Sequence, residues 1–471
     1  MKDAPDAPHP ILPDLRALLG DAHVLTGAQT AAVARDWTGK WQAAPLALVR
    51  PADTAQVAGC LRLAARHGVA VVPVGGNTGL VGGTANEGAL MVSLERMGAI
   101  REIRPEARIA VVEAGAILSD VHDAAAAHDL VFPLTFGARG SARIGGALST
   151  NAGGSNVVRY GSTRGLCLGL EVVLADGRVL DLMSELHKDN SGLDLRDLFI
   201  GAEGTLGLIT AAVLKLAPMP RHPATAFAAV ADLPAALRLL NAVQAASDGA
   251  VEAFEYMPRT YMSALATHRP DLRQPFPVHD HAVMIELGGL SRPLTDVLEA
   301  ALTAAAERGD VLDATIAQSE AQRARIWEMR EAAAEITFTR LPIVDNDVCL
   351  PVDRVADFVD AMTARLSRMD PGAEHLIVSH LGDGNVHLTL YPTRDDPDHL
   401  DALREMVEDE TIRLRGSISA EHGIGLSKLA TMRRRKDPVA LDVMRAVKRA
   451  LDPHDLLNPG KVIPPEPRDG G

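Results

Sequence analysis

The sequence has few cysteines, no excess of basic residues and no long apolar run. Its three cysteines, Cys60, Cys167 and Cys349, are widely spaced and include no C-x-x-C pair, which excludes a disulfide framework and predicts buried free thiols. The formal net charge of −14 excludes a broad nucleic-acid surface. The one dense basic run, residues 433–436, is short and typical of a solvated helix face.

No apolar stretch approaches the ~18 residues that a membrane-spanning helix needs. Residues 1–8 contain acidic residues and prolines, where a signal peptide would need a basic end and an apolar core. We therefore expect a cytoplasmic protein without an integral membrane segment. A chain of 471 residues exceeds one ordinary core, so about two or three domains are expected.

Two histidines flank a Gly-Asp-Gly turn within the segment Ser-His-Leu-Gly-Asp-Gly-Asn-Val-His, residues 379–387. Residues 375–379 and 386–390 are short apolar segments typical of strands, and a hairpin would bring His380 and His387 together. A single histidine near a strand end is more often a satisfied polar residue than a ligand. The flanking turn, and the pair Glu421 and His422 on a later loop, favour the second interpretation.

Two neutral imidazoles and one carboxylate with an open position are typical of a catalytic divalent-metal site. We predict that His380, His387 and Glu421 hold zinc, with manganese or iron as alternatives. The neighbouring His422 would then be available to move protons. The prediction requires that the hairpin and the later loop meet in the fold.

Glycine-rich turns follow several predicted strands in the first half of the chain. The strand at 69–74 leads into residues 75–83, of which five are glycine, and exposed backbone amides in such a loop suit phosphate. The loop is neither G-x-G-x-x-G nor Walker A, which disfavours a Rossmann nicotinamide domain. Further turns near residues 132–141, 144–146 and 150–161 would line one groove suited to a dinucleotide.

The remaining pattern predicts the frame around these motifs. Helices are expected at about 54–67, 121–128 and 401–414, and a hairpin with an Asp-Gly turn at 170–180. The prolines at 217–220 mark a boundary. Beyond it, residues 224–345 alternate Ala-rich helices with short strands, which predicts an α+β substrate domain.

Several motifs occur in an order that resembles the FAD-linked D-2-hydroxy-acid dehydrogenases of the vanillyl-alcohol-oxidase superfamily. The resemblance covers roughly residues 45–465 and is strongest to the D-2-hydroxyglutarate dehydrogenases. The segments that carry it are Gly-Gly-Asn-Thr-Gly at 75–79, Asn-Ala-Gly-Gly at 151–154, Arg-Tyr-Gly at 159–161, Lys-Asp-Asn-Ser-Gly at 188–192, Phe-Ile-Gly-Ala-Glu-Gly-Thr-Leu-Gly at 199–207, His-Leu-Gly-Asp-Gly-Asn at 380–385, Ala-Glu-His-Gly at 420–423 and Asn-Pro-Gly-Lys at 458–461.

The resemblance implies an α+β protein with a PCMH-type FAD-binding domain of two subdomains. Residues 1–44 would form a helical lead-in, 45–220 the FAD domain, 221–430 an α+β cap carrying the metal site, and 431–471 a segment returning to the FAD domain. Some relatives attach the flavin through a histidine in the first glycine loop. Asn77 stands in that loop, so non-covalent FAD is expected. The residues that would contact FAD are Pro73, Gly75, Gly76, Asn77, Thr78, Gly79, Leu80, Pro133, Leu134, Gly137, Gly140, Ser141, Gly145, Asn151, Gly153, Gly161, Glu203, Gly204, Gly207 and Asn458.

The resemblance also implies the chemistry. A D-2-hydroxy acid would be oxidised to its 2-keto acid by hydride transfer to FAD, with metal assistance and with His422 as the base. Arg330 would bind a substrate carboxylate, and Asn385 would help to position the substrate. The electrons would pass to an external acceptor such as an electron-transfer flavoprotein or a quinone. Family members are often dimers, so a homodimer is one expectation.

Two positions depart from the hydroxyglutarate pattern. Relatives acting on that substrate carry a Thr and a Lys where this chain has Ala334 and, in an ungapped alignment, Asp345. The second carboxylate of a hydroxyglutarate would then lack the side chains that bind it, unless Arg340 takes their place. A D-lactate or glycolate dehydrogenase is therefore the alternative within the class, and a non-catalytic flavin- or metal-binding protein is the alternative outside it.

Overall fold

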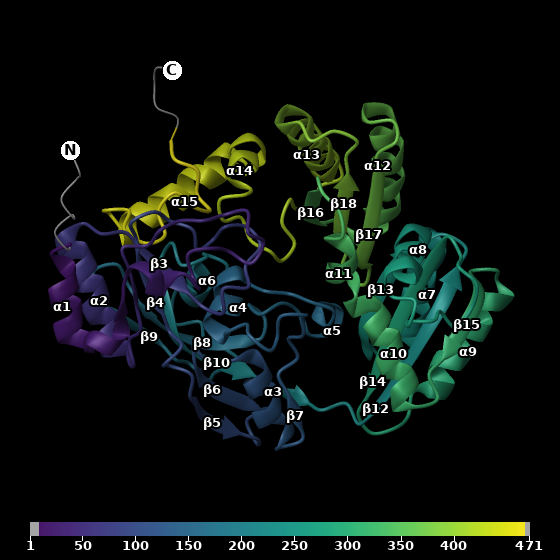
Figure 1. Ribbon diagram of the computed structural model, residues 1–471. Coiled ribbons are helices and arrows are strands. Elements are labelled where there is room, and N and C mark those ends of the chain that lie inside the picture. The colour runs from purple at the N-terminus through teal and green to yellow at the C-terminus, as the bar shows by residue number, and fades with distance from the viewer. Residues whose placement is uncertain (1–8, 467–471) are drawn as a thin grey trace.

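The computed structural model describes residues 9–466. Residues 1–8, whose composition argues against a signal peptide, lie outside the described residues. Figure 1 shows two lobes, with the N-terminal half and the last helices in one and residues 222–413 in the other. Of the three cysteines, Cys60 and Cys167 are buried, as predicted, whereas Cys349 is half-buried. Within the described range, no helix combines the length and apolar character needed to cross a membrane.

A four-stranded sheet in the first lobe has the order β1-β2-β4-β3. Its strands are β1 (Val24–Leu25), β2 (Ala47–Val49), β4 (Leu90–Ser93) and β3 (Val71–Val74), and β4 pairs in parallel with both β2 and β3. Helices α1 (Ile11–Leu19) and α2 (Thr54–His67) belong to the same hydrophobic core. The predicted helix at 54–67 is confirmed, and its Asp53 cap accepts a hydrogen bond from the backbone of Gln56.

A second, antiparallel sheet in this lobe has the order β5-β6-β10-β8-β9. The predicted hairpin at 170–180 is confirmed as β8 paired with β9. The elements of this layer are β5 (Ile100–Arg104), β6 (Ile109–Glu113), β8 (Cys167–Val173), β9 (Val179–Leu182), β10 (Leu208–Lys215), the small pair β7 (Leu130–Val131) and β11 (Ala217–Pro218), and helices α3 (Leu118–Ala126), α4 (Ile144–Thr150), α5 (Val157–Tyr160) and α6 (Arg196–Phe199).

The second lobe is built on a seven-stranded antiparallel sheet of order β15-β12-β14-β13-β17-β18-β16. The alternation of strands and Ala-rich helices expected from the sequence is present. The strands are β12 (His222–Val230), β13 (Val251–Pro258), β14 (His281–Gly289), β15 (Val311–Ile316), β16 (Val344–Cys349), β17 (Glu374–His380) and β18 (Asn385–Tyr391), and the helices are α7 (Leu233–Ala246), α8 (Arg259–His268), α9 (Thr295–Glu307), α10 (Glu320–Glu331), α11 (Ala333–Thr337), α12 (Val355–Met369) and α13 (Pro397–Arg413).

The C-terminal segment returns to the first lobe, where α15 (Pro438–Leu451) lies beside the N-terminal elements (Figure 1). Backbone bonds from Val71 to Leu456 (2.7 Å) and from Asn458 to Val71 (2.8 Å) place it beside β3. In the basic run at 433–436, Arg433, Arg434 and Lys436 are exposed, as expected of a solvated face. Within α14 (Leu429–Arg435), Arg434 and Arg435 also pair with carboxylates of the neighbouring α13. The domain boundaries proposed above stay predictions.

Candidate active site

The predicted hairpin brings His380 and His387 together. β17 and β18 pair in the register His380 with Asn385 and Val378 with His387, and the two imidazole centroids lie 5.4 Å apart. The turn requires glycine at position 384, where φ is 86° and an added Cβ would overlap the backbone of Leu350.

Glu421 and His422 come from the loop between α13 and α14. Nε2 of His387 lies 3.6 Å from Oε1 of Glu421, and the potential ligand atoms of His380, His387 and Glu421 all lie within 4.8 Å of one another. Two ligand atoms of a tetrahedral zinc, each about 2.1 Å from the metal, are roughly 3.4 Å apart. The His387–Glu421 separation therefore fits two ligands of one cation better than a direct hydrogen bond.

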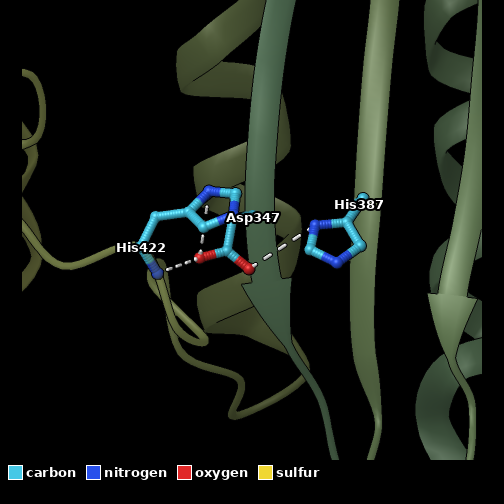
Figure 2. Close-up of side chains that lie close together, drawn as sticks. All are labelled: Asp347, His387 and His422. Carbon is cyan, nitrogen blue, oxygen red and sulfur yellow. Dashed lines mark hydrogen bonds and ion pairs between the residues drawn. The ribbon is translucent and has the colours of Figure 1, made fainter. Parts of the chain in front are cut away.

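Asp347, on β16, fixes the loop that carries Glu421 (Figure 2). Its Oδ2 accepts hydrogen bonds from the backbone N–H groups of Ala420 (3.2 Å), Glu421 (3.0 Å) and His422 (2.9 Å). Burial alone would raise the pKa of Asp347, but the nearby His422 and other basic groups lower it well below its usual range. The carboxylate therefore stays ionised although it is buried.

Asp347, His387 and His422 form a second group of potential ligands. Nδ1 of His422 and Nδ1 of His387 lie 3.6 and 3.9 Å from Asp347 (Figure 2). However, Asp347 already accepts several hydrogen bonds, including one from Nδ2 of Asn385 (2.9 Å). This use of its lone pairs makes Asp347 a poorer ligand than Glu421, and suits it to orienting the imidazoles.

Glu255 of β13, a fully buried carboxylate, orients the imidazole of His380. Nδ1 of His380 lies 2.8 Å from Oε1 of Glu255, which leaves Nε2 of His380 for a ligand. Arg330 of α10 donates from Nε to Glu255 (2.6 Å), and its Nη2 lies 3.4 Å from the His380 ring. Burial raises the pKa of Glu255, but His380 and Arg330 outweigh it and lower the pKa to about 2.

Both the glycine loops and the histidines line one cavity of about 750 Å³. This volume lies in the range of small-molecule and cofactor sites. The predicted site residues that line it are Pro73, Gly75, Gly76, Asn77, Thr78, Gly79, Leu80, Gly137, Ser141, Gly145, Gly153, Glu203, Gly207, Arg330, His380, His387, Glu421, His422 and Asn458. The predicted residues outside its lining are Pro133, Leu134, Gly140, Asn151, Gly161, Gly204 and Asn385.

The glycine loops of the groove lie so close to other segments of the chain that a side chain would not fit at some positions. A Cβ at Gly76 would overlap the carbonyl oxygen of Ser141. Asn77 adopts a left-handed φ of 52° and donates from Nδ2 to Arg35 (2.9 Å), so its side chain is used in shaping the loop. A Cβ at Gly153 would lie 3.1 Å from Oε2 of Glu421, which places the metal-site loop directly against the groove.

Glu203 connects the groove to the same loop. Its carboxylate accepts hydrogen bonds from the backbone of Ile424 (2.6 Å) and Gly425 (2.9 Å), while its carbonyl accepts one from Nδ2 of Asn458 (2.8 Å). Burial raises the pKa of Glu203. These bonds join three segments that are distant in the sequence at one wall of the cavity.

The positions that depart from the hydroxyglutarate pattern, Ala334 and Asp345, both line the cavity. Arg340 does not replace the missing cation, because it lies outside the lining, pairs with Glu374 and stacks 3.9 Å over the ring of Tyr391. Sequence reasoning missed Asp347 and Glu255. The available signal for Glu255 was a carboxylate within a largely apolar, buried strand, whereas Asp347 lies in a strand that also contains Asp345 and Asn346 and had no comparable signal.

Comparison with known families decides the class. A family described as FAD linked oxidases, C-terminal domain, matches residues 219–462, and one described as FAD binding domain matches residues 45–183. The chain is 38% identical over 455 residues to "Probable D-2-hydroxyglutarate dehydrogenase, mitochondrial" of Oryza sativa subsp. indica, covering 95% of this chain and 81% of that protein. The chain belongs to the FAD-linked D-2-hydroxy-acid dehydrogenases.

Other members of this family, among them bacterial ones, match along most of their length. "D-2-hydroxyglutarate dehydrogenase" of Stutzerimonas stutzeri is 34% identical over 461 residues, or 96% of this chain and 98% of that protein. The bovine mitochondrial enzyme of that name is 38% identical over 433 residues, or 91% of this chain and 79% of its own length. The chain is therefore an FAD-linked oxidoreductase, as predicted.

Solved structures support the predicted PCMH-type fold. A substrate-bound p-cresol methylhydroxylase superposes with a TM-score of 0.76 at 18% identity, covering 96% of each chain. An alkyldihydroxyacetonephosphate synthase superposes with a TM-score of 0.70 at 15% identity, covering 98% of this chain and 86% of the other. At these identities the likeness concerns the fold alone.

Proposed function

We propose that the protein oxidises a D-2-hydroxy acid of the D-2-hydroxyglutarate type to the 2-keto acid, with non-covalently bound FAD and a divalent metal held by His380, His387 and Glu421. The observation that carries the proposal is the 3.6 Å spacing of His387 and Glu421 in a cavity shared with the glycine loops. The names of the relatives support the substrate class.

When bound, the metal would acidify the substrate hydroxyl and the flavin would accept the hydride. Nε2 of His422 lies 3.7 Å from Oε1 of Glu421, close enough to take a proton from a hydroxyl next to that carboxylate. Asp347 orients the imidazole of His422 from the opposite side. This arrangement supports His422 as the base.

Arg330 supplies positive charge on the cap side of the cavity. Its Nε is used by Glu255, and its Nη2 lies beside His380, so its remaining N–H groups can hold the substrate carboxylate next to the metal ligands. Asn385 contributes indirectly, since its amide donates to Asp347 and to the carbonyl of Val348. We therefore infer that Asn385 positions the base rather than the substrate.

Anaerobic mixing of the FAD- and zinc-loaded protein with D- and L-2-hydroxyglutarate tests this function. Loss of the oxidised-flavin absorbance with the D enantiomer alone is the expected result. No bleaching with any D-2-hydroxy acid would instead favour a non-catalytic flavin- or metal-binding protein. The physiological acceptor is proposed to be an external one, such as an electron-transfer flavoprotein or a quinone.

A D-lactate or glycolate dehydrogenase is the second candidate. It is favoured by the small Ala334 and the anionic Asp345 in the cavity lining, since neither can bind a second carboxylate. Bleaching by D-lactate at a higher kcat/KM than by five-carbon D-2-hydroxy acids would establish it.

A further inference from the structure

The three strands at the edge of the cap sheet arrange the cavity floor in rows. One row contains Asp347, His387 and Val378, paired across β16, β18 and β17, and of these His387 and Val378 line the cavity. Two residues along each strand, on the same face, the next row contains Asp345, Thr389 and Leu376. Such rows are about 7 Å apart, because a strand rises about 3.4 Å per residue.

The second row lies within reach of a substrate bound at the first. Asp345, Thr389 and Leu376 all line the cavity. A hydroxy acid anchored at His387 that extends along this face would bring the end of a chain of about five carbons to the second row. This row is a substrate subsite only if the proposed function is correct, since that function places the hydroxy acid at His387.

The charge of this subsite is negative. Oδ1 of Asp345 accepts a hydrogen bond from Thr389 (2.7 Å), and among the described residues no lysine, arginine or histidine nitrogen lies within 4.0 Å of its carboxylate. Two cations nearby in the fold have other partners: Arg340 pairs with Glu374, and Nζ of Lys428, which Asp345 also attracts, bonds to the carbonyl of Asp347 (3.4 Å) and lies 3.8 Å from its Oδ2. Oδ2 of Asp345 accepts no hydrogen bond from the described residues.

We propose that, among the D-2-hydroxy acids that the protein oxidises, Asp345 and Thr389 favour those whose far end is a hydrogen-bond donor, such as an amide, over those that end in a second carboxylate. Asp345 can accept a hydrogen bond from a donor, whereas a carboxylate beside it meets a like charge with no cation between them. Ala334 and Thr337, which also line the cavity, supply no positive charge either.

The test compares three five-carbon D-2-hydroxy acids that differ at one end: D-2-hydroxyglutarate, its 5-amide and D-2-hydroxypentanoate. Anaerobic flavin reduction of the FAD- and zinc-loaded protein gives kcat/KM for each. We expect the amide to exceed the diacid by at least about tenfold, with the methyl-ended acid between them.

Asp345→Asn should raise kcat/KM for the diacid at least about tenfold and leave the methyl-ended acid within about threefold, because of these two acids only the diacid carries a charge at its far end. Asp313→Asn, the same charge change on the exposed far edge strand β15, should alter none of the three values. A merely structural role of Asp345 would instead change all three acids together.

The outcomes separate this proposal from the function on which it rests. If no D-2-hydroxy acid bleaches the flavin, the proposed function fails and the subsite with it. If the diacid is the best of the three substrates and Asp345→Asn does not improve it, the subsite assignment is overturned while the function stands.

Discussion

Individual carboxylates around the cavity differ in how many lone pairs they have left for a cation. Asp347 is 2% exposed and accepts three backbone hydrogen bonds, and Glu255 is fully buried against His380 and Arg330. Glu421 is half-buried and is positioned by a backbone that Asp347 holds. This difference supports the assignment of Glu421 as the ligand and of the other two as supports.

His380→Ala and His422→Asn distinguish the two groups of potential ligands. If His380, His387 and Glu421 hold the metal, His380→Ala should lower bound zinc at least about tenfold, while His422→Asn retains it. Elemental analysis of the FAD-loaded variants gives the answer without any activity measurement. Retention of zinc by His380→Ala together with its loss from His422→Asn would favour the group that contains Asp347.

Lys461 predicts a pH dependence of stability. Burial lowers its pKa from 10.5 to about 8, and its Nζ donates to Oδ1 of Asn458 (2.6 Å). Between these pH values the unfolded chain binds more protons than the folded chain, so this lysine makes stability rise with pH. Relative to Lys461→Met, the free energy of unfolding of the wild type should rise by about 3 kcal/mol as the pH is raised from neutral to about 10.

Urea unfolding of both proteins at pH 7 and pH 9.5 measures this gain. The variant also loses the hydrogen bond to Asn458, which changes its free energy of unfolding by the same amount at both pH values. The diagnostic quantity is therefore how the difference in free energy of unfolding between the two proteins changes from pH 7 to pH 9.5. If the two proteins differ in free energy of unfolding by the same amount at pH 7 and at pH 9.5, burial does not lower the pKa of Lys461.

Among the elements, the β17–β18 hairpin was predictable because its signals are local. Apolar strands, the Asp-Gly turn and the two histidines all lie within residues 375–390. Helix α13 begins at Pro397, earlier than the predicted residue 401, because Asp396 caps it by accepting from the backbone of His399. Glu255 could not be found in this way, since it meets His380 across 125 residues of sequence.

The first glycine loop makes a prediction about FAD binding. Gly76→Ala must displace the Ser141 carbonyl and with it the opposite wall of the groove, so purified protein should contain little FAD, at most about a tenth of the wild-type content. Flavin absorbance per protein measures this. Gly98→Ala is the matched control, because its Cβ would make only ordinary contacts, the nearest at 3.5 Å. Equal FAD content in both variants would contradict the prediction that this loop binds the phosphates of FAD.

At the scale of the whole molecule, the two lobes are joined by a buried polar cluster. Nη1 of Arg159 on α5 donates to Glu252 on β13 (3.0 Å) and to the carbonyl of Gly288 (2.9 Å), and the hydroxyl of Tyr160 donates to Glu252 (2.6 Å). Burial raises the pKa of Glu252, so the carboxylate depends on these donors to stay ionised. This cluster helps to fix the cap histidines relative to the glycine groove.

Arg159→Gln should therefore destabilise the protein by about 3 kcal/mol, because it leaves a buried carboxylate poorly paired. Chemical denaturation with flavin release as the signal measures this. Arg259→Gln breaks a pair in which both side chains are at least half exposed, and should leave the denaturation midpoint unchanged. Equal midpoints for both variants would show that the cluster does not hold the lobes together.

The domain boundaries stay predictions, whereas the FAD-binding fold was predictable from the resemblance. The preference proposed for the far end of the substrate was not predictable, because the sequence does not tell which face of β16 points to the cavity, the one with Asp345 and Asp347 or the one with Asn346. Asp345 and Asp347 are two residues apart and share a face, yet one contacts the substrate cavity and the other the metal-site loop.

We propose that a divalent metal, which His380, His387 and Glu421 would hold, assists hydride transfer from the substrate to bound FAD. The most direct test measures anaerobic flavin reduction by a D-2-hydroxy acid in chelator-treated protein, with FAD content matched before and after zinc is restored. We predict a rate at least about a thousandfold lower without zinc and full recovery on its return. Equal rates in the zinc-free and zinc-loaded proteins would show that hydride transfer does not need the metal.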